Sequence, residues 1–370
     1  MKSGLQHTRI NILTEGFRTP NGRAFLTPIL RHRSQLADLG YDISLFNKID
    51  ARLYECDVLA VESKFFKSAW GVKLEDTLAK LEQFRAKVST LIFFDTTDSS
   101  GWVHAKPLKY VDAYYKSQLM LDRDYYSEPL YGHRLHTDFY HRGYNVVDEN
   151  ASYSEPIENP SDLSKIDVSW NSGLGNHSRH SPLLNQMFRV CPLRFLLCLG
   201  LDTVPPSKPR DINVHFRSRL TYSRETVAFQ RKQIKSMLPR KPAKKIRRGK
   251  YFKELADSAA VVSPFGWGEI TLKDFEVFLS GAVLIKPSME HMETWPPFYV
   301  PNQTYIPFDW DLSNFKDVLQ NFLDRKAEYQ KIAFDGQQLY QKFAVEKGSG
   351  GLFANRFDYL IKKAQKNSER

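Results

Sequence analysis

The chain has 370 residues, of which 42% are hydrophobic and 13% aromatic. This length allows two domains with cores of their own, and the composition excludes a disordered or fibrous protein. The net charge of +11 is concentrated in residues 205–250, which hold fifteen Lys or Arg residues and two acids. Such a basic block is typical of a solvated surface, a nucleic-acid or membrane patch, or the lining of an anion site.

The first half of the chain alternates apolar runs with amphipathic segments. We expect strands at residues 10–13, 41–46, 58–61 and 90–94, helices at 25–39, 73–87 and 183–201, and loops at 14–23 and 149–167. Residues 110–144 show no clean periodicity. Strands separated by helices of this length predict a parallel sheet with helices on its faces.

The sequence 205–209, PPSKP, reads as a stiff linker, after which the pattern starts again. We expect strands at 212–216, 259–262, 282–285 and 305–308, and helices at 223–237, 251–258, 272–279, 312–323, 325–343 and 353–366. A basic loop is expected at 239–250. The prediction is therefore an α/β protein with two Rossmann-like domains, residues 1–204 and 205–350, facing across a cleft.

Compartment and membrane signals are few. Three scattered cysteines without a C-x-x-C pair give no disulfide framework or zinc site and indicate a reducing compartment. The N-terminus has no signal-peptide core. Residues 187–204 come nearest to a membrane span, but Arg189, Arg194 and Asp202 interrupt them, which favours a buried interdomain helix. We expect a cytoplasmic protein that can lie peripherally on an anionic inner membrane.

The most informative stretch is 261–295, VVSPFGWGEITLKDFEVFLSGAVLIKPSMEHMETW. An apolar strand is followed by a loop with Gly266 and Gly268, an amphipathic helix that Gly281 ends, and a second apolar strand. Such a unit places free N–H groups and the positive end of a helix at the carboxyl edge of a parallel sheet. Phosphate-bearing ligands bind at that edge.

SPFGWGE, DFE and SGAVLIKP together resemble the donor-binding segment of GT-B glycosyltransferases, especially the exostosin-like and group 1 branch. In that family the glutamate of an E-x4-G-x3-I pattern binds the ribose of the sugar nucleotide, and Glu276, Gly281 and Ile285 match it here. The resemblance covers residues 250–311. The retaining branch has a second glutamate eight positions earlier, where this chain has Gly268, with Glu269 one place off. The resemblance therefore implies an inverting, metal-independent transferase, with a last helix, 351–370, that packs back on the first domain.

Transfer from a nucleotide sugar needs a cradle for the diphosphate, because that group leaves with negative charge. Arg217 and Arg219 follow the first strand of the second domain, two residues apart, so an extended chain would point both the same way. The remaining donor-binding candidates are Lys250, Ser263, Gly266, Gly268, Glu269, Thr271 and Glu276. Thr271 is expected above all to cap the helix that follows it.

In inverting enzymes of this family the general base belongs to the first domain. The strand at 90–94 ends in Asp95 and is followed by Asp98, so we expect Asp98, or else Asp95, to take the proton of the acceptor hydroxyl. A turn or helix-cap cluster is the alternative for both. The expected acceptor-binding residues are His104, Lys116, Arg134 and His136.

A metal site is not expected. His133, His136 and Asp138 lack further ligands at a recognised spacing, and Asp309 and Asp311 read as a helix start. The expected partners are a nucleotide-diphosphate sugar as co-substrate, with no other cofactor, and a glycan or glycolipid acceptor. The alternative is a non-catalytic protein whose basic block binds nucleic acid or an anionic membrane. The lack of aromatic residues within 231–250 weighs against the nucleic-acid form of it.

Overall fold

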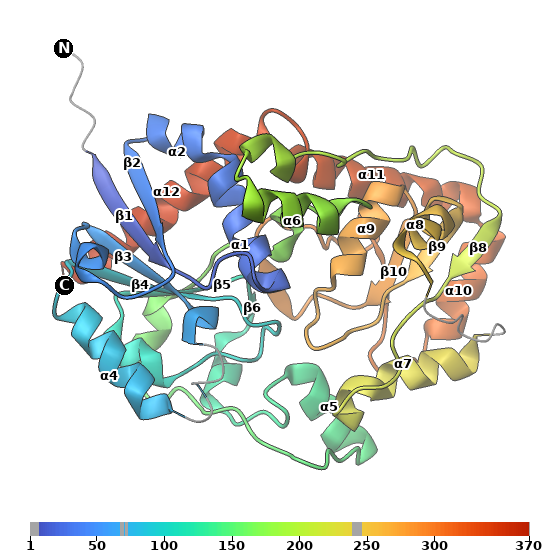
Figure 1. The fold of residues 1–370 in the computed structure, drawn as a ribbon. Helices are drawn as coiled ribbons and strands as arrows, with labels where there is room; N and C mark the ends of the chain where they lie inside the picture. Colours follow the sequence, from blue (N-terminus) through green and yellow to red (C-terminus); the bar gives the residue numbers. More distant parts are fainter. Residues whose placement is uncertain (1–6, 67–69, 71–72, 239–245, 370) are drawn as a thin grey trace.

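Two parallel β-sheets, each with helices packed on it, form the two halves of the molecule (Figure 1). The computed structural model describes residues 7–66, 70, 73–238 and 246–369, so most of the expected basic loop, 239–245, lies outside the described residues. The first sheet has the strand order β2-β1-β3-β4-β5-β7 and the second β12-β10-β9-β8. This confirms the predicted α/β fold with two Rossmann-like domains.

The first sheet is built from β1 (Thr8–Leu13), β2 (Tyr41–Phe46), β3 (Val58–Glu62), β4 (Thr90–Asp95), β5 (Ala113–Lys116) and β7 (Ile166–Val168). Strand β1 pairs with both β2 and β3, and Ile10 lies opposite Ile43 and Val58. Every residue of β3 and β4 is buried, as expected for parallel strands with both faces covered. The helices of this half are α1 (Pro20–Arg31), α2 (Arg33–Asp38), α4 (Leu74–Arg85), α5 (Leu135–Tyr144) and α6 (Ser181–Val190).

The second sheet is built from β8 (Ile212–His215), β9 (Ser258–Val262), β10 (Val283–Pro287) and β12 (Ile306–Phe308). Its half of the chain contains the helices α7 (Glu225–Met237), α8 (Arg248–Ala256), α9 (Leu272–Ser280), α10 (Phe315–Asp324), α11 (Lys326–Ala344) and α12 (Ser349–Ser368). Gly281 ends α9 with a φ of 64°, a left-handed conformation that favours glycine. A short antiparallel pair, β6 (Gln118–Met120) with β11 (Met292–Thr294), joins the two halves.

The first helix begins earlier than the sequence suggested. We expected a loop at 14–23 and one helix over 25–39, whereas α1 starts at Pro20 and the chain breaks at His32 before α2. The reason is a strong N-terminal signal: Thr19 accepts a hydrogen bond from the Gly22 N–H, and Pro20 occupies the first helical position. This start matters because it brings the N-terminus of α1 to the space between the domains.

The helix expected at 183–201 is wrong in length, and the burial expected for residues 187–204 is wrong for much of that stretch. Helix α6 ends at Val190, and a single 3-10 turn, η7 (Arg194–Leu197), follows it. Val190 is 86% exposed and Phe195 is 56% exposed. Pro192 lies between the two pieces and cannot continue a helix.

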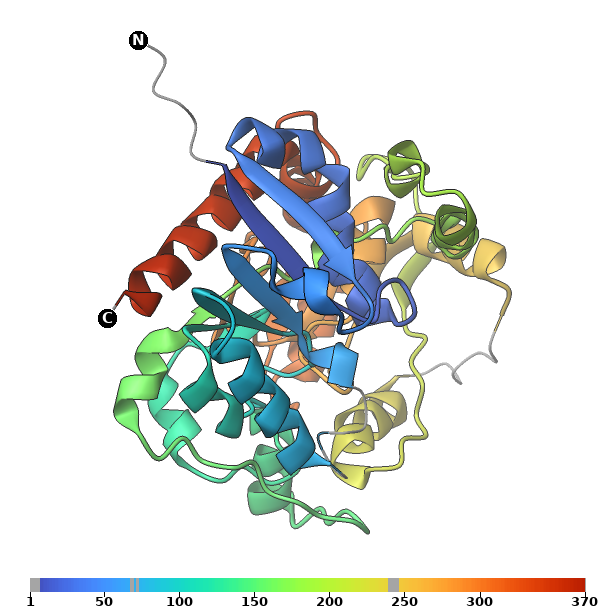
Figure 2. The ribbon, with the colours of Figure 1, turned by 60° about the vertical axis from the view of Figure 1, so that its left-hand side comes forward.

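The last helix, α12, lies against the first sheet although it follows the second in sequence (Figure 2). The Tyr115 hydroxyl of β5 donates a hydrogen bond to the Leu360 carbonyl over 2.7 Å. Phe353 and Phe357 are buried against Trp170, with ring centroids 5.1 and 6.2 Å from it. Helix α12 therefore covers one face of the first sheet.

Candidate active site

A pocket of about 310 Å³ lies between the two domains, where the carboxyl ends of strands from both sheets meet. Segments that follow β4, β5 and β7 line it from one side, and segments that follow β8 and β9 line it from the other. Its lining residues are Pro20, Asn21, Ala24, Phe25, Thr96, Thr97, Asp98, Ser117, Gln118, Ser169, Trp170, Asn171, Ser172, Tyr222, Arg231, Gly266, Trp267, Gly268, Ile270, Thr271 and Leu272. Open α/β sheets bind ligands at this edge.

Asp98 lines the pocket with an exposed side chain. Its Oδ1 accepts a hydrogen bond of 2.8 Å from Asn21 at the start of α1, and its backbone carbonyl accepts one from Gln118. Asn21 therefore orients the carboxylate, whose exposed side chain can accept the proton of a bound hydroxyl.

Asp95 does not face the pocket. Its carboxylate is buried with Lys116, 2.9 Å away, and accepts a 2.6 Å hydrogen bond from the Tyr114 hydroxyl. Burial alone would raise the pKa of Asp95, but the charges of Lys116 and His104 and these hydrogen bonds hold it well below its ordinary value. The pair is part of the core, which removes Asp95 from the candidates for a base and Lys116 from those for acceptor binding.

The other acceptor-binding candidates also lie outside the pocket lining. His104 stacks on Trp70 with ring centroids 4.5 Å apart, and burial lowers its pKa to about 4. His136 is buried with its Nδ1 3.7 Å from Glu269. Arg134 donates to the Trp267 carbonyl. Arg134 and Lys116 each bind a residue that lines the pocket, Trp267 and Thr97 respectively.

The glycine loop after β9 forms one wall of the pocket, as expected. A side chain on Gly268 would place its Cβ 1.7 Å from the Asp98 carbonyl oxygen, so only glycine fits there. Gly266 donates its N–H to the Gly268 carbonyl over 3.0 Å. The loop thus brings the second domain into contact with the segment that carries Asp98.

Arg231 is a pocket residue that the sequence analysis missed. It extends from α7 to the glycine loop and donates to the Phe265 carbonyl, and its guanidinium lies 5.1 Å from the Tyr222 ring. Its hydrogen-bond acceptors are neutral carbonyl groups, so its charge remains available to an anion in the pocket. Arg231 lies on the buried side of α7 together with Val227 and Ile234. A charged residue at an apolar position of a predicted helix is the sequence feature that could have indicated its role.

Two helix N-termini also reach the pocket, that of α1 at Pro20 and that of α9 at Thr271. Thr271 is the N-cap of α9, as expected, and its N–H donates to the Asp274 carboxylate over 3.0 Å. Ser263 is buried and donates to the same carboxylate, so it supports the cap rather than facing the pocket. The positive ends of both helices favour a negatively charged ligand.

Glu276 lines a second pocket of about 160 Å³ that shares Pro20, Ala24 and Leu272 with the first. Its carboxylate pairs with Arg248 over 3.1 Å and accepts a 2.9 Å hydrogen bond from the Tyr251 hydroxyl. Burial raises the pKa of Glu276, against the opposing effect of Arg248. The two pockets together offer adjoining space for a ligand larger than either.

The expected arginine pair and Lys250 lie outside both pockets. Arg217 makes a two-pronged ion pair with Glu254, with distances of 2.6 and 3.0 Å. Arg219 is exposed and donates to the Thr221 carbonyl, and Lys250 is exposed on α8. Strand β8 ends at His215, before both arginines, and neither arginine lines either pocket, so the structure does not bring the pair to one anion there.

Glu269, a donor-binding candidate, joins the two domains instead. It is fully buried and accepts hydrogen bonds from the Ser99 hydroxyl and from both the N–H and the hydroxyl of Ser100, at 3.0 to 3.1 Å. Burial alone would raise the pKa of Glu269, but His136 and His291 beside it hold that pKa well below its ordinary value. Its negative charge is therefore part of the domain contact.

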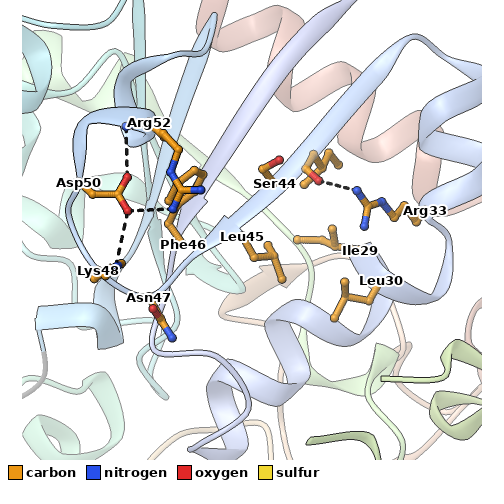
Figure 3. Close-up of a pocket in the computed structure, with 11 residues that line it drawn as sticks. Ile29, Leu30, Arg33, Ser44, Leu45, Phe46, Asn47, Lys48, Asp50 and Arg52 are labelled. Carbon is orange, nitrogen blue, oxygen red and sulfur yellow. Dashed lines mark hydrogen bonds and ion pairs between the residues drawn. The ribbon is translucent and has the colours of Figure 1, made fainter. Parts of the chain in front are cut away.

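Two further observations bear on ligands. Within the described ranges, no group of three or more His, Cys, Asp or Glu residues is placed to hold a metal ion. A larger pocket of about 490 Å³ lies on the outer side of β2, away from every candidate residue (Figure 3). Its one carboxylate, Asp50, is already bound by Lys48 and Arg52.

No family model matches the chain, and no curated protein matches it. Among solved structures, the Anabaena protein HepE in complex with UDP and glucose is 11% identical, with a TM-score of 0.45, over 96% of this chain and 100% of that chain. Sucrose-phosphate synthase from Thermosynechococcus elongatus is 9% identical, with a TM-score of 0.43 and the same coverage of both chains. An alpha-glucosyltransferase in complex with UDP-glucose and DNA is 11% identical, with a TM-score of 0.42 and again the same coverage. The function proposed below rests on this chain's own residues.

Proposed function

We propose that the chain is a glycosyltransferase that moves a sugar from a nucleotide-diphosphate sugar to a hydroxyl of a glycan or glycolipid. The observation that carries this proposal is the shared pocket, in which strand ends of two parallel sheets, two helix N-termini and Arg231 surround one space. A diphosphate fits these positive groups. The adjoining pocket beside Glu276 is the proposed place of the nucleoside, with the Glu276 carboxylate accepting hydrogen bonds from the ribose hydroxyls.

The proposed reaction is a single displacement with inversion. The acceptor oxygen forms a bond to the anomeric carbon while the bond from that carbon to the diphosphate oxygen breaks, and Asp98 takes the proton of the hydroxyl. The leaving nucleoside diphosphate carries the electron pair, and its growing charge is stabilised by the two helix ends and Arg231. We propose that this stabilisation makes the reaction metal-independent.

The test is a thermal-shift titration with UDP, GDP, CDP and their sugars. A ligand that binds only the folded protein raises Tm by mass action, so one nucleotide should stand out. Glu276→Gln should lose most of that shift, whereas Glu328→Gln on the exposed surface of α11 should keep it. Asp98→Asn should keep the shift and lose turnover of the selected donor. No shift with any nucleotide, together with salt-sensitive binding to random DNA, would overturn the proposal in favour of a nucleic-acid-binding protein.

A further inference from the structure

The surface over α6 and η7 carries an unusual concentration of exposed apolar side chains. We call it the α6–η7 ridge, made up of Leu183, Met187, Val190, Leu193, Phe195 and Leu199, each at least 44% exposed. An apolar patch of this extent on the surface of a protein marks an interaction site. The ridge lies on the opposite side of the molecule from α5 (Figures 1 and 2).

Helix α6 is apolar on two faces, and the fold uses only one of them. Leu184 and Phe188 point inward, where the Phe188 ring lies 4.9 Å from Phe17. Leu183, Met187 and Val190 are spaced four and three residues apart, which places them together on the outer face. The inner face already packs on the rest of the protein, so folding does not require apolar residues on the outer face.

The charged residues of the segment that forms the ridge all have one sign. No Asp or Glu occurs between Asp167 and Asp202, whereas Arg179, Arg189 and Arg194 lie in this stretch. None of these three arginines forms an ion pair with any residue in the described ranges. The basic start of α8 adjoins them, since Arg248 donates to the Arg179 carbonyl over 2.9 Å. The ridge thus combines exposed apolar side chains with three exposed arginines from the same segment.

We propose that the α6–η7 ridge is a docking surface for an anionic phospholipid bilayer. Apolar side chains would enter the interface between headgroups and acyl chains, while the arginines bind lipid phosphates. No helix in the described part of the chain is long and apolar enough to cross a bilayer, so the protein would lie on the membrane. A second copy of the chain fits the ridge less well, because a two-fold contact would bring the arginines of both copies together.

Docking through the ridge would also orient the proposed active site. Ser181, Pro182 and Asn185 of α6 line the same pocket as Glu276. The bilayer surface would therefore lie beside the pocket proposed for the nucleoside, which adjoins the pocket where a lipid-linked acceptor would meet Asp98. This last step rests on the proposed function, but the docking itself does not.

The test is co-sedimentation with vesicles of phosphatidylcholine alone and with vesicles that also contain phosphatidylglycerol. The wild type should sediment with the anionic vesicles. Val190→Asp should weaken this binding about tenfold or more, because it places a charge in the apolar interface. Replacing Arg189 and Arg194 by Gln should cost about fivefold for each arginine. Val147→Asp is the matched control, since Val147 is 63% exposed just beyond α5, and it should bind like the wild type.

Three results would overturn the docking proposal. The first is a wild type that binds neither vesicle, and the second is a Val190→Asp variant that binds anionic vesicles as tightly as the wild type does. The third is a ridge that mediates self-association, which size-exclusion chromatography without lipid would show as a change of oligomeric state in Val190→Asp. Nucleotide thermal shifts measured on the same variants separate this question from the proposed function, since the ridge substitutions should leave those shifts unchanged.

Discussion

Two aspartates three residues apart show how the environment of a residue decides its role. Asp95 is the last residue of β4 and points into the core, whereas Asp98 lies in the loop beyond and points into the pocket. The sequence predicted that one of them faces the cleft but could not decide between them on physical grounds. The deciding partners, Lys116 and Asn21, are distant in sequence, so only the folded chain brings them to the two carboxylates.

The Asp95–Lys116 pair predicts a specific pH dependence of stability. The folded state holds the pKa of Asp95 below its unfolded value, so its contribution is fully present above an ordinary aspartate pKa, about 4. It is lost progressively as the pH falls below that value. At neutral pH, Asp95→Asn leaves Lys116 buried without a charged partner and should lower the free energy of unfolding by about 3–5 kcal/mol. Urea unfolding at neutral and at acidic pH measures both effects.

The matched control for this prediction is Asp50→Asn, which breaks a surface pair with Arg52. Exposed pairs contribute little, so this variant should unfold like the wild type at every pH. If Asp95→Asn and the wild type kept the same difference in stability down to acidic pH, the pKa of Asp95 would be the same in the folded and the unfolded chain. The buried pair would then not hold that pKa down.

At the scale of elements, the long buried strands were predicted well, whereas β7 (Ile166–Val168) begins inside the expected loop at 149–167 and was missed. Apolar runs such as 58–61 and 90–94 are buried on both faces, and that pattern leaves few alternatives. Residues 110–144 show no periodic signal, because β5 and β6 are short and fully buried and α5 carries a mixed surface. Helix α6 was predicted as buried because both of its faces are apolar, and a sequence does not show which face a neighbour covers.

Helix α12 depends on one buried aromatic side chain for its contact with the first sheet. Phe357 is buried between Tyr41 and Trp170, where it fixes the helix to the first sheet. Phe357→Ala would leave a cavity there and should lower the free energy of unfolding by about 3–5 kcal/mol. Phe334→Ala on α11, where the ring is 51% exposed, should change it by less than about 1 kcal/mol. Chemical denaturation of both variants is the measurement, and equal effects would show that α12 does not depend on this contact.

At the scale of the whole molecule, the two domains are held together by the same segments that form the pocket. Glu269 binds Ser99 and Ser100, and Arg134 binds the Trp267 carbonyl, so the glycine loop is fixed from the opposite domain. The sequence predicted the loop and its place at the sheet edge. It gave no sign that Glu269 would serve the domain contact, because that role depends on residues from the other domain.

At Gly268 the glycine loop approaches the Asp98 segment of the other domain so closely that no side chain fits. In Gly268→Ala the new Cβ would overlap the Asp98 carbonyl oxygen, so the glycine loop and the Asp98 segment must move apart. This movement weakens the hydrogen bonds of Glu269, so we expect the free energy of unfolding to fall by about 1–3 kcal/mol. It also shifts the proposed base, Asp98, so we expect a strong loss of turnover. Gly351→Ala in α12 is the matched control, because the new Cβ meets nothing within 4 Å. Since alanine favours a helix more than glycine does, this variant should be more stable than the wild type by up to about 1 kcal/mol. If Gly268→Ala were as stable and active as the wild type, the domains would not need this approach for function, and the pocket would have to form from a more open arrangement.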